Sequence, residues 1–116
     1  MRYIEAAGWT LEVPETHVER TRGLLGRTEL DPLHALVLAR CSSVHTIGMR
    51  FPIDVIAFDA DWSIVEVRTM PPGRVSWPRR RVRNVIETAA GRGAAFSASL
   101  DGRTIRGALG TGRRRT

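Results

Sequence analysis

Apolar residues fall into short runs and alternating stretches along the chain, a pattern typical of a β-rich domain. The clearest run covers residues 53–58, which are apolar at five of six positions and rich in β-branched residues. It predicts a strand buried on both faces, or nearly so. An acidic turn and an alternating segment, residues 64–68, follow and predict a β-hairpin. Further strands are expected at residues 9–13, 34–39, 82–88 and, as a last short one, 104–106.

One helix is predicted near the N-terminus. It opens at Pro14, a residue tolerated in a first turn, and Gly26 is a natural residue just past its end, which gives about ten helical residues. Its apolar face is expected to contain Val18, Thr21, Leu24 and Leu25. A shorter helical segment is expected at residues 94–99.

These elements favour the α+β class, with mainly antiparallel β structure and one N-terminal helix. We expect the sheet to be curled into a sandwich or a partly closed barrel. The 116 residues are enough for one domain with its own core, which we assign to residues 1–107. Glycine and arginine dominate residues 108–116 and predict a disordered basic tail.

The cysteine content and the net charge bear on the expected compartment and on a possible nucleic-acid partner. The single cysteine, Cys41, excludes an internal disulfide, and no apolar run is long enough for a signal peptide or a membrane span, so we expect a cytoplasmic protein. The net charge is +6, but seven arginines within residues 79–83 and 113–115 exceed that excess, and lysine is absent. We interpret the arginines as compositional bias. Nucleic-acid contact through Arg79–Arg83, beside Trp77, stays an alternative function.

Cys41, His45 and Asp54 are the candidate catalytic residues. Cys41 and His45 lie four residues apart and share one side of either a helix or an extended chain. A thiol, an imidazole and an orienting carboxylate are the minimum for nucleophilic catalysis, so a small hydrolase or a metal-dependent enzyme is an alternative function. With His34 and Glu87 these are also zinc-type ligands, but their spacing matches no compact metal motif. No metal and no cofactor are predicted.

Asp54 is the one charge inside the apolar run of residues 53–58, and a buried carboxylate must be paired, hydrogen-bonded or protonated. If its strand neighbours that of Glu87, the two carboxylates meet and one pKa rises. We favour a structural role instead, in which Asp54 accepts backbone N–H groups or pairs with Arg50 or Arg22.

Several segments, in this order, resemble one known family: ERTRGLLGR, SVHTIGMRFPIDVIAFDAD, a double-proline turn and VIETAAG. The chain resembles the family of conserved proteins called domain of unknown function 192, or uncharacterised ACR, over about residues 9–106. The most specific match is Met49, then Pro52-Ile53-Asp54, then Asp59. The resemblance implies a compact, mainly antiparallel β fold with one helix near the N-terminus, and no established activity. Many members carry Trp-Met-Lys-Asn-Thr where this chain has residues 45–50, so a function of that tryptophan or lysine is not carried over.

We therefore predict a non-enzymatic binding or interaction domain for a small ligand or a protein. Its surface is expected to combine residues 41–50, Asp54 and the turn at residues 71–77. The predicted binding residues are His45, Thr46, Met49, Asp54, Trp77 and Glu87.

Overall fold

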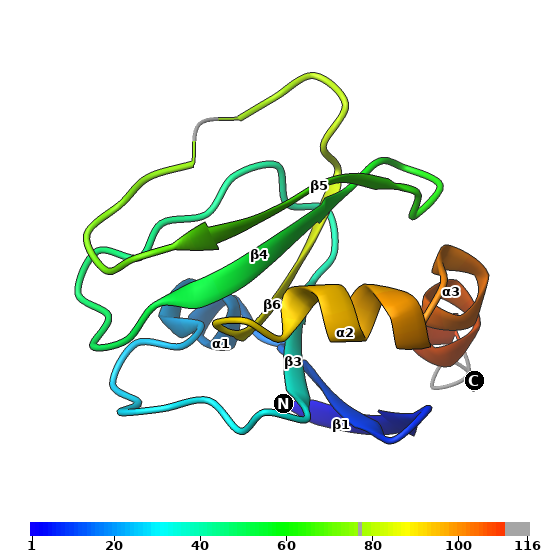
Figure 1. The fold of residues 1–116 in the computed structure, drawn as a ribbon, viewed down its shortest axis with the longest axis horizontal. Coiled ribbons are helices and arrows are strands. Elements are labelled where there is room, and N and C mark those ends of the chain that lie inside the picture. Colours follow the sequence, from blue (N-terminus) through cyan, green and yellow to red (C-terminus); the bar gives the residue numbers. More distant parts are fainter. Residues whose placement is uncertain (77, 111–116) are drawn as a thin grey trace.

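Six strands form one open sheet in the computed structural model, which describes residues 1–76 and 78–110 (Figure 1). The strands are β1 (Arg2–Ala6), β2 (Trp9–Val13), β3 (His34–Leu38), β4 (Ile53–Phe58), β5 (Ile64–Met70) and β6 (Asn84–Ala89). Their order across the sheet is β1-β2-β3-β6-β4-β5, and only the β2–β3 pair is parallel. The α+β class, the mainly antiparallel sheet and the predicted hairpin of β4 and β5 are confirmed. The sheet itself does not close.

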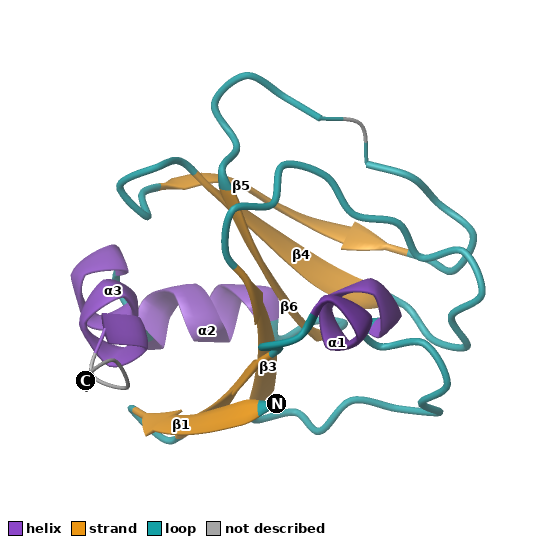
Figure 2. Cartoon of the chain, turned by 180° about the vertical axis from the view of Figure 1, so that it is seen from behind, coloured by secondary structure: helices purple, strands orange, loops and turns teal. Residues whose placement is uncertain are grey.

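Helices lie on both faces of the sheet. The helix α1 (His17–Arg22) lies on one face, and α2 (Gly93–Ser99) and α3 (Gly102–Gly110) lie on the other, as the opposite views of Figure 1 and Figure 2 show. Each face therefore has its own apolar cluster: Val55 belongs to the one beneath α1, and Ile56 to the one beneath α2 and α3. Because both faces are covered, every residue of β4 is buried, as its continuous apolar run predicts.

The helix α1 is shorter than predicted. Thr16 caps it by accepting the backbone N–H of Glu19, whose side chain binds back to the cap. The helix ends at Gly23, which has a φ of 52°, before Gly26 is reached. Consequently the predicted apolar face is wrong for Val18, which is 74% exposed, and none of the residues within the helix is buried.

The segment predicted as a last strand, residues 104–106, is instead part of α3. Asp101 accepts the backbone N–H of Thr104 at 2.8 Å, as a helix cap does, and the following turns place Ile105 in the core. The predicted boundary at residue 107 falls inside this helix. The arginines at 113–115 lie outside the described residues. The predicted helical segment at residues 94–99 is confirmed as α2.

Candidate binding site

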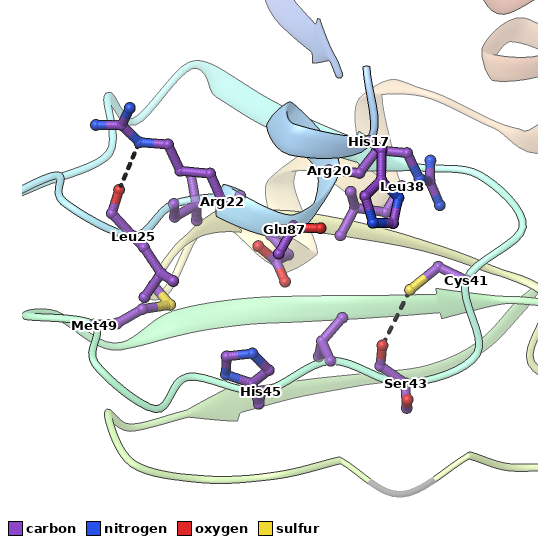
Figure 3. Close-up of a pocket in the computed structure, with 14 residues that line it drawn as sticks. His17, Arg20, Arg22, Leu25, Leu38, Cys41, Ser43, His45, Met49 and Glu87 are labelled. Atoms are coloured by element: carbon purple, nitrogen blue, oxygen red, sulfur yellow. Dashed lines mark hydrogen bonds between the residues drawn. The ribbon is translucent and has the colours of Figure 1, made fainter. Parts of the chain in front are cut away.

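A cavity of about 320 Å³ lies on the face of the sheet that carries α1. The end of α1 and the turn after it form one wall, and residues 41–49 form the opposite wall (Figure 3). Its volume is at the lower end of the range, about 300–1,000 Å³, in which pockets hold small organic molecules. The lining side chains are of four kinds: basic His17, Arg20, Arg22 and His45, apolar Leu24, Leu25, Leu38, Val44 and Met49, the small polar or thiol groups of Thr21, Ser43 and Cys41, and the acidic Glu87.

Glu87 lies at the middle of this cavity, between α1 and the segment with His45 and Met49 (Figure 3). It sits on the central strand β6, opposite Leu36 of β3 and Val55 of β4, so it projects from a row of core side chains. The residue is only 5% exposed, and no other described residue gives it a hydrogen bond or an ion pair. Burial alone raises the pKa of this carboxyl from 4.5 to about 7.

Glu12 is a second buried carboxylate on the same face of the sheet, and it has hydrogen-bond and ion-pair partners. It lies two strands away, on β2, opposite Leu36. Arg27 donates to both of its oxygens, at 2.7 and 3.2 Å, and His34 Nδ1 lies 2.8 Å from Oε2. Burial acts to raise the pKa of Glu12, but the hydrogen bonds and charges of Arg27 and His34 together outweigh it, so the pKa is lowered. Glu87 is therefore distinguished from Glu12 by its lack of partners in the described part of the chain.

Cys41 and His45 line the same cavity, so the structure brings these two predicted residues together. The Cys41 thiol donates to the carbonyl of Ser43 at 3.0 Å. Burial raises the pKa of the thiol, Arg20 acts to lower it and Glu87 acts to raise it further, and the net direction is upward. A raised pKa keeps Cys41 as the neutral thiol, which is a poor nucleophile.

Asp54 lies on the opposite face of the sheet, beneath α2. One of its oxygens accepts the Thr69 hydroxyl at 2.7 Å, and the other accepts the backbone N–H groups of Gly91 and Gly93 at 3.0 and 2.9 Å. The favoured structural role, acceptance of backbone N–H groups, matches this geometry. Although β4 and β6 are neighbours, Asp54 is paired with Thr88 and Glu87 with Val55, so the two carboxylates point to opposite faces. Cys41, His45 and Asp54 therefore do not converge.

The remaining predicted binding residues divide between the cavity and the loops. Met49 is buried and lines the cavity. The hydroxyl of Thr46, which is fully buried, donates to the carbonyl of Pro71 at 2.6 Å and accepts the N–H of Arg74 at 2.9 Å, so Thr46 joins two loops. Trp77 lies outside the described residues.

Sequence reasoning missed Arg20, which reaches the cavity from α1. Its Nη2 donates to the carbonyl of Ala39 at 2.8 Å, which holds the guanidinium group near Cys41. An arginine in a helix of mixed charge carries no signal of this position. The ion-paired set around Glu12 was missed too, because the alternating pattern of β2 does not show that both Leu11 and Glu12 are buried.

Two other features are less suited to a ligand. A more open hollow of about 570 Å³ includes Arg40, Trp62 and Asn84, but the Asn84 amide is already bound to the N–H of Arg40 and the carbonyl of Asp59. Within residues 1–76 and 78–110, no three histidine, cysteine, aspartate or glutamate side chains gather as a metal site. Among the described helices, none is long and apolar enough to cross a membrane.

The family model of DUF192, described as an uncharacterised ACR, matches residues 3–104. A UPF0127 protein of Pyrococcus horikoshii is 30% identical over 87 residues, which are 70% of this chain and 73% of the relative. A UPF0127 protein of Pyrococcus abyssi is 29% identical over the same length, 70% of this chain and 72% of its own.

Two solved structures share the fold. A Sinorhizobium meliloti protein, described as a proposed transcription regulator, superposes with a TM-score of 0.64 at 22% identity, over 87% of this chain and 86% of its own. A Novosphingobium aromaticivorans protein of unknown function has a TM-score of 0.55 at 19% identity, over 82% of this chain and 75% of its own. At these identities the similarity shows the fold alone.

Proposed function

The chain belongs to the DUF192 family, whose function is uncharacterised, and we propose that it is a non-enzymatic domain that binds a small organic molecule. The ligand occupies the cavity between α1 and residues 41–49, and it presents a hydrogen-bond donor or a positive charge to Glu87.

The Glu87 carboxyl, which has no hydrogen-bond or ion-pair partner within residues 1–76 and 78–110, is the observation that carries this proposal. A buried carboxylate without a partner costs free energy, and buried polar groups in native proteins almost always have one. The same face of the sheet satisfies Glu12 fully, so the fold is able to supply partners where a carboxylate serves structure alone. A buried, perturbed carboxyl that opens on a cavity is typical of a binding or catalytic site.

Binding is favoured over catalysis by the state of the candidate catalytic residues. The neutral Cys41 thiol lacks activation, and the Asp54 carboxylate is held by Thr69, Gly91 and Gly93. Nucleic acid is not the favoured partner either, because Arg79 pairs with Glu66 at 2.5 Å and Arg83 donates to the carbonyl groups of Arg80 and Val82. The single free cysteine supports a reducing, cytoplasmic compartment.

A ligand-probe experiment tests the proposal. Isoamylamine and isoamyl alcohol, which pair one hydrogen-bonding head with an apolar body, are titrated into the ¹⁵N-labelled protein while amide shifts are followed. We expect saturable shifts confined to the cavity walls, with an affinity for isoamylamine that is about tenfold weaker in Glu87→Gln and unchanged in Glu29→Gln, a control that removes an exposed carboxylate elsewhere. An isoamylamine affinity that is equal in Glu87→Gln and the native protein would overturn the proposal, as would the absence of saturable shifts for every small organic probe tested.

A further inference from the structure

We propose that the ligand is a small zwitterion with an apolar body, of the α-amino-acid class, whose ammonium group binds Glu87 and whose carboxylate binds the basic side chains of the cavity. This inference rests on the proposed function and specifies the ligand of the same site.

The cavity is lined by more basic than acidic side chains, and the two kinds come from different elements. Glu87 is the only acidic side chain among the lining residues, whereas four lining residues are basic. His17, Arg20 and Arg22 come from α1, and His45 comes from the opposite wall; the guanidinium groups of Arg20 and Arg22 lie to either side of Glu87 (Figure 3). A ligand with one positive and one negative group matches both sets.

The two arginines retain unused donors. Within the described part of the chain neither forms an ion pair. Among the described residues, Arg20 uses Nη2 on the carbonyl of Ala39, and Arg22 makes only a long contact of 3.5 Å from Nε to the carbonyl of Leu25. Because a guanidinium has five N–H donors and matches a carboxylate with two parallel hydrogen bonds, each arginine is able to bind an anionic group.

Ligands with one charge fit less well. A simple ammonium ion gains the attraction of Glu87 but leaves the donors of the two arginines that line the same cavity unused. A simple carboxylate gains the arginines but is repelled by Glu87, unless that side chain takes up a proton. A zwitterion satisfies both signs with Glu87 ionised, and its body meets the apolar wall of Leu24, Leu38 and Met49.

Three related probes separate these cases. L-leucine carries both charged groups, isoamylamine is the same molecule without the carboxylate, and isocaproate is the same molecule without the ammonium group. Their affinities are measured by calorimetry at about pH 8, where Glu87 is largely ionised, and at about pH 6, where it is largely protonated. The titratable and charged groups that line the cavity with Glu87 are His17, Arg20, Arg22 and His45, and the neighbouring Cys41 thiol is neutral.

We expect L-leucine to bind at least about tenfold more tightly than either half-molecule at the higher pH, since one charge-assisted hydrogen bond contributes that factor or more. Glu87→Gln should weaken L-leucine and isoamylamine by about tenfold. Arg20→Gln or Arg22→Gln should weaken L-leucine and isocaproate but leave isoamylamine unchanged. The control Arg40→Gln, an exposed arginine outside the cavity lining, should change none of the three affinities.

The possible failures are distinct. If isoamylamine binds through Glu87 as tightly as L-leucine does, or if neither arginine variant weakens L-leucine selectively, the zwitterion inference is overturned and the proposed function stands. If isocaproate matches L-leucine, the ligand is a simple anion and the inference is overturned. If these probes and isoamyl alcohol all leave the cavity unperturbed, the proposed function fails together with the inference. Arg22, being exposed, provides a test that does not depend on the fold tolerating a change at Arg20.

Discussion

Replacing Glu87 with glutamine should stabilise the folded protein, and the gain should grow with pH. Below pH 4.5 the Glu87 carboxyl is protonated in both the folded and the unfolded chain, so its ionisation does not affect stability. Between pH 4.5 and about 7 the unfolded chain releases this proton while the folded protein keeps it. The free energy of unfolding of the native sequence therefore falls by about 1.4 kcal/mol per pH unit through this window, and then levels off.

The magnitude follows from the two pKa values. The difference between 4.5 and about 7 corresponds to a loss of about 3 kcal/mol at pH 8. Glutamine has nearly the same shape and does not ionise, so the stability difference between Glu87→Gln and the native sequence should increase by about 3 kcal/mol from pH 4.5 to pH 8. In a domain of this size that corresponds to a relative rise in Tm of about 10 °C.

Urea unfolding of both proteins at several pH values measures this difference directly. Glu12→Gln is the matched control, because Glu12 is equally buried on the same face but is paired with Arg27 and His34. Its lowered pKa reverses the sign, and we expect it to lose about 1–3 kcal/mol near pH 7. A stability difference for Glu87→Gln that does not change with pH, or that has the sign of Glu12→Gln, would refute the reasoning.

Three further predictions concern the rest of the fold. Asp54→Ala should lower the free energy of unfolding in urea by about 3 kcal/mol, because the backbone N–H groups of Gly91 and Gly93 lose their acceptor; a loss below about 0.5 kcal/mol would contradict the capping role. The Cys41 thiol should react with iodoacetamide more slowly at pH 7 than a free cysteine does, since burial raises its pKa, and a faster reaction would restore the catalytic alternative. Gly102→Ala should lower the Tm measured by circular dichroism, because a Cβ there would overlap the backbone carbonyl of Trp62; an unchanged Tm would show that α3 is free to shift.

Local pattern was sufficient to predict the central hairpin and the acceptance of backbone N–H groups by Asp54, but Asp54 was wrongly expected on the binding surface with residues 41–50. The run at residues 53–58 is apolar at alternate and intervening positions, and such a continuous short run predicts a strand that is covered on both faces. A lone carboxylate within it requires donors, and backbone N–H groups at the start of α2 provide them. The chemistry of one residue in one strand therefore follows from neighbours in the sequence.

Which residues line the cavity could not be predicted from local sequence patterns, because it depends on how the strands pair and where α1 crosses the sheet. Whether Asp54 and Glu87 meet is decided by the register of β4 against β6, and a shift of one residue reverses the answer. Arg20 reaches the cavity because α1 connects the parallel strands β2 and β3 and so crosses one face of the sheet. The helix α3 was missed since its three glycines weaken the helical signal of Ile105, Ala108 and Leu109.

The titration of the Glu87 carboxyl carbon by ¹³C NMR, in the free protein and with saturating isoamylamine, tests the central claim most directly. For the free protein we predict a midpoint at about pH 7, and with the amine bound we predict a clearly lower midpoint, because an ammonium group stabilises the ionised carboxylate. A midpoint near 4.5 in the free protein would mean that Glu87 already has a partner. A midpoint near 7 that the amine leaves unchanged would mean that the cavity does not use Glu87 to bind it.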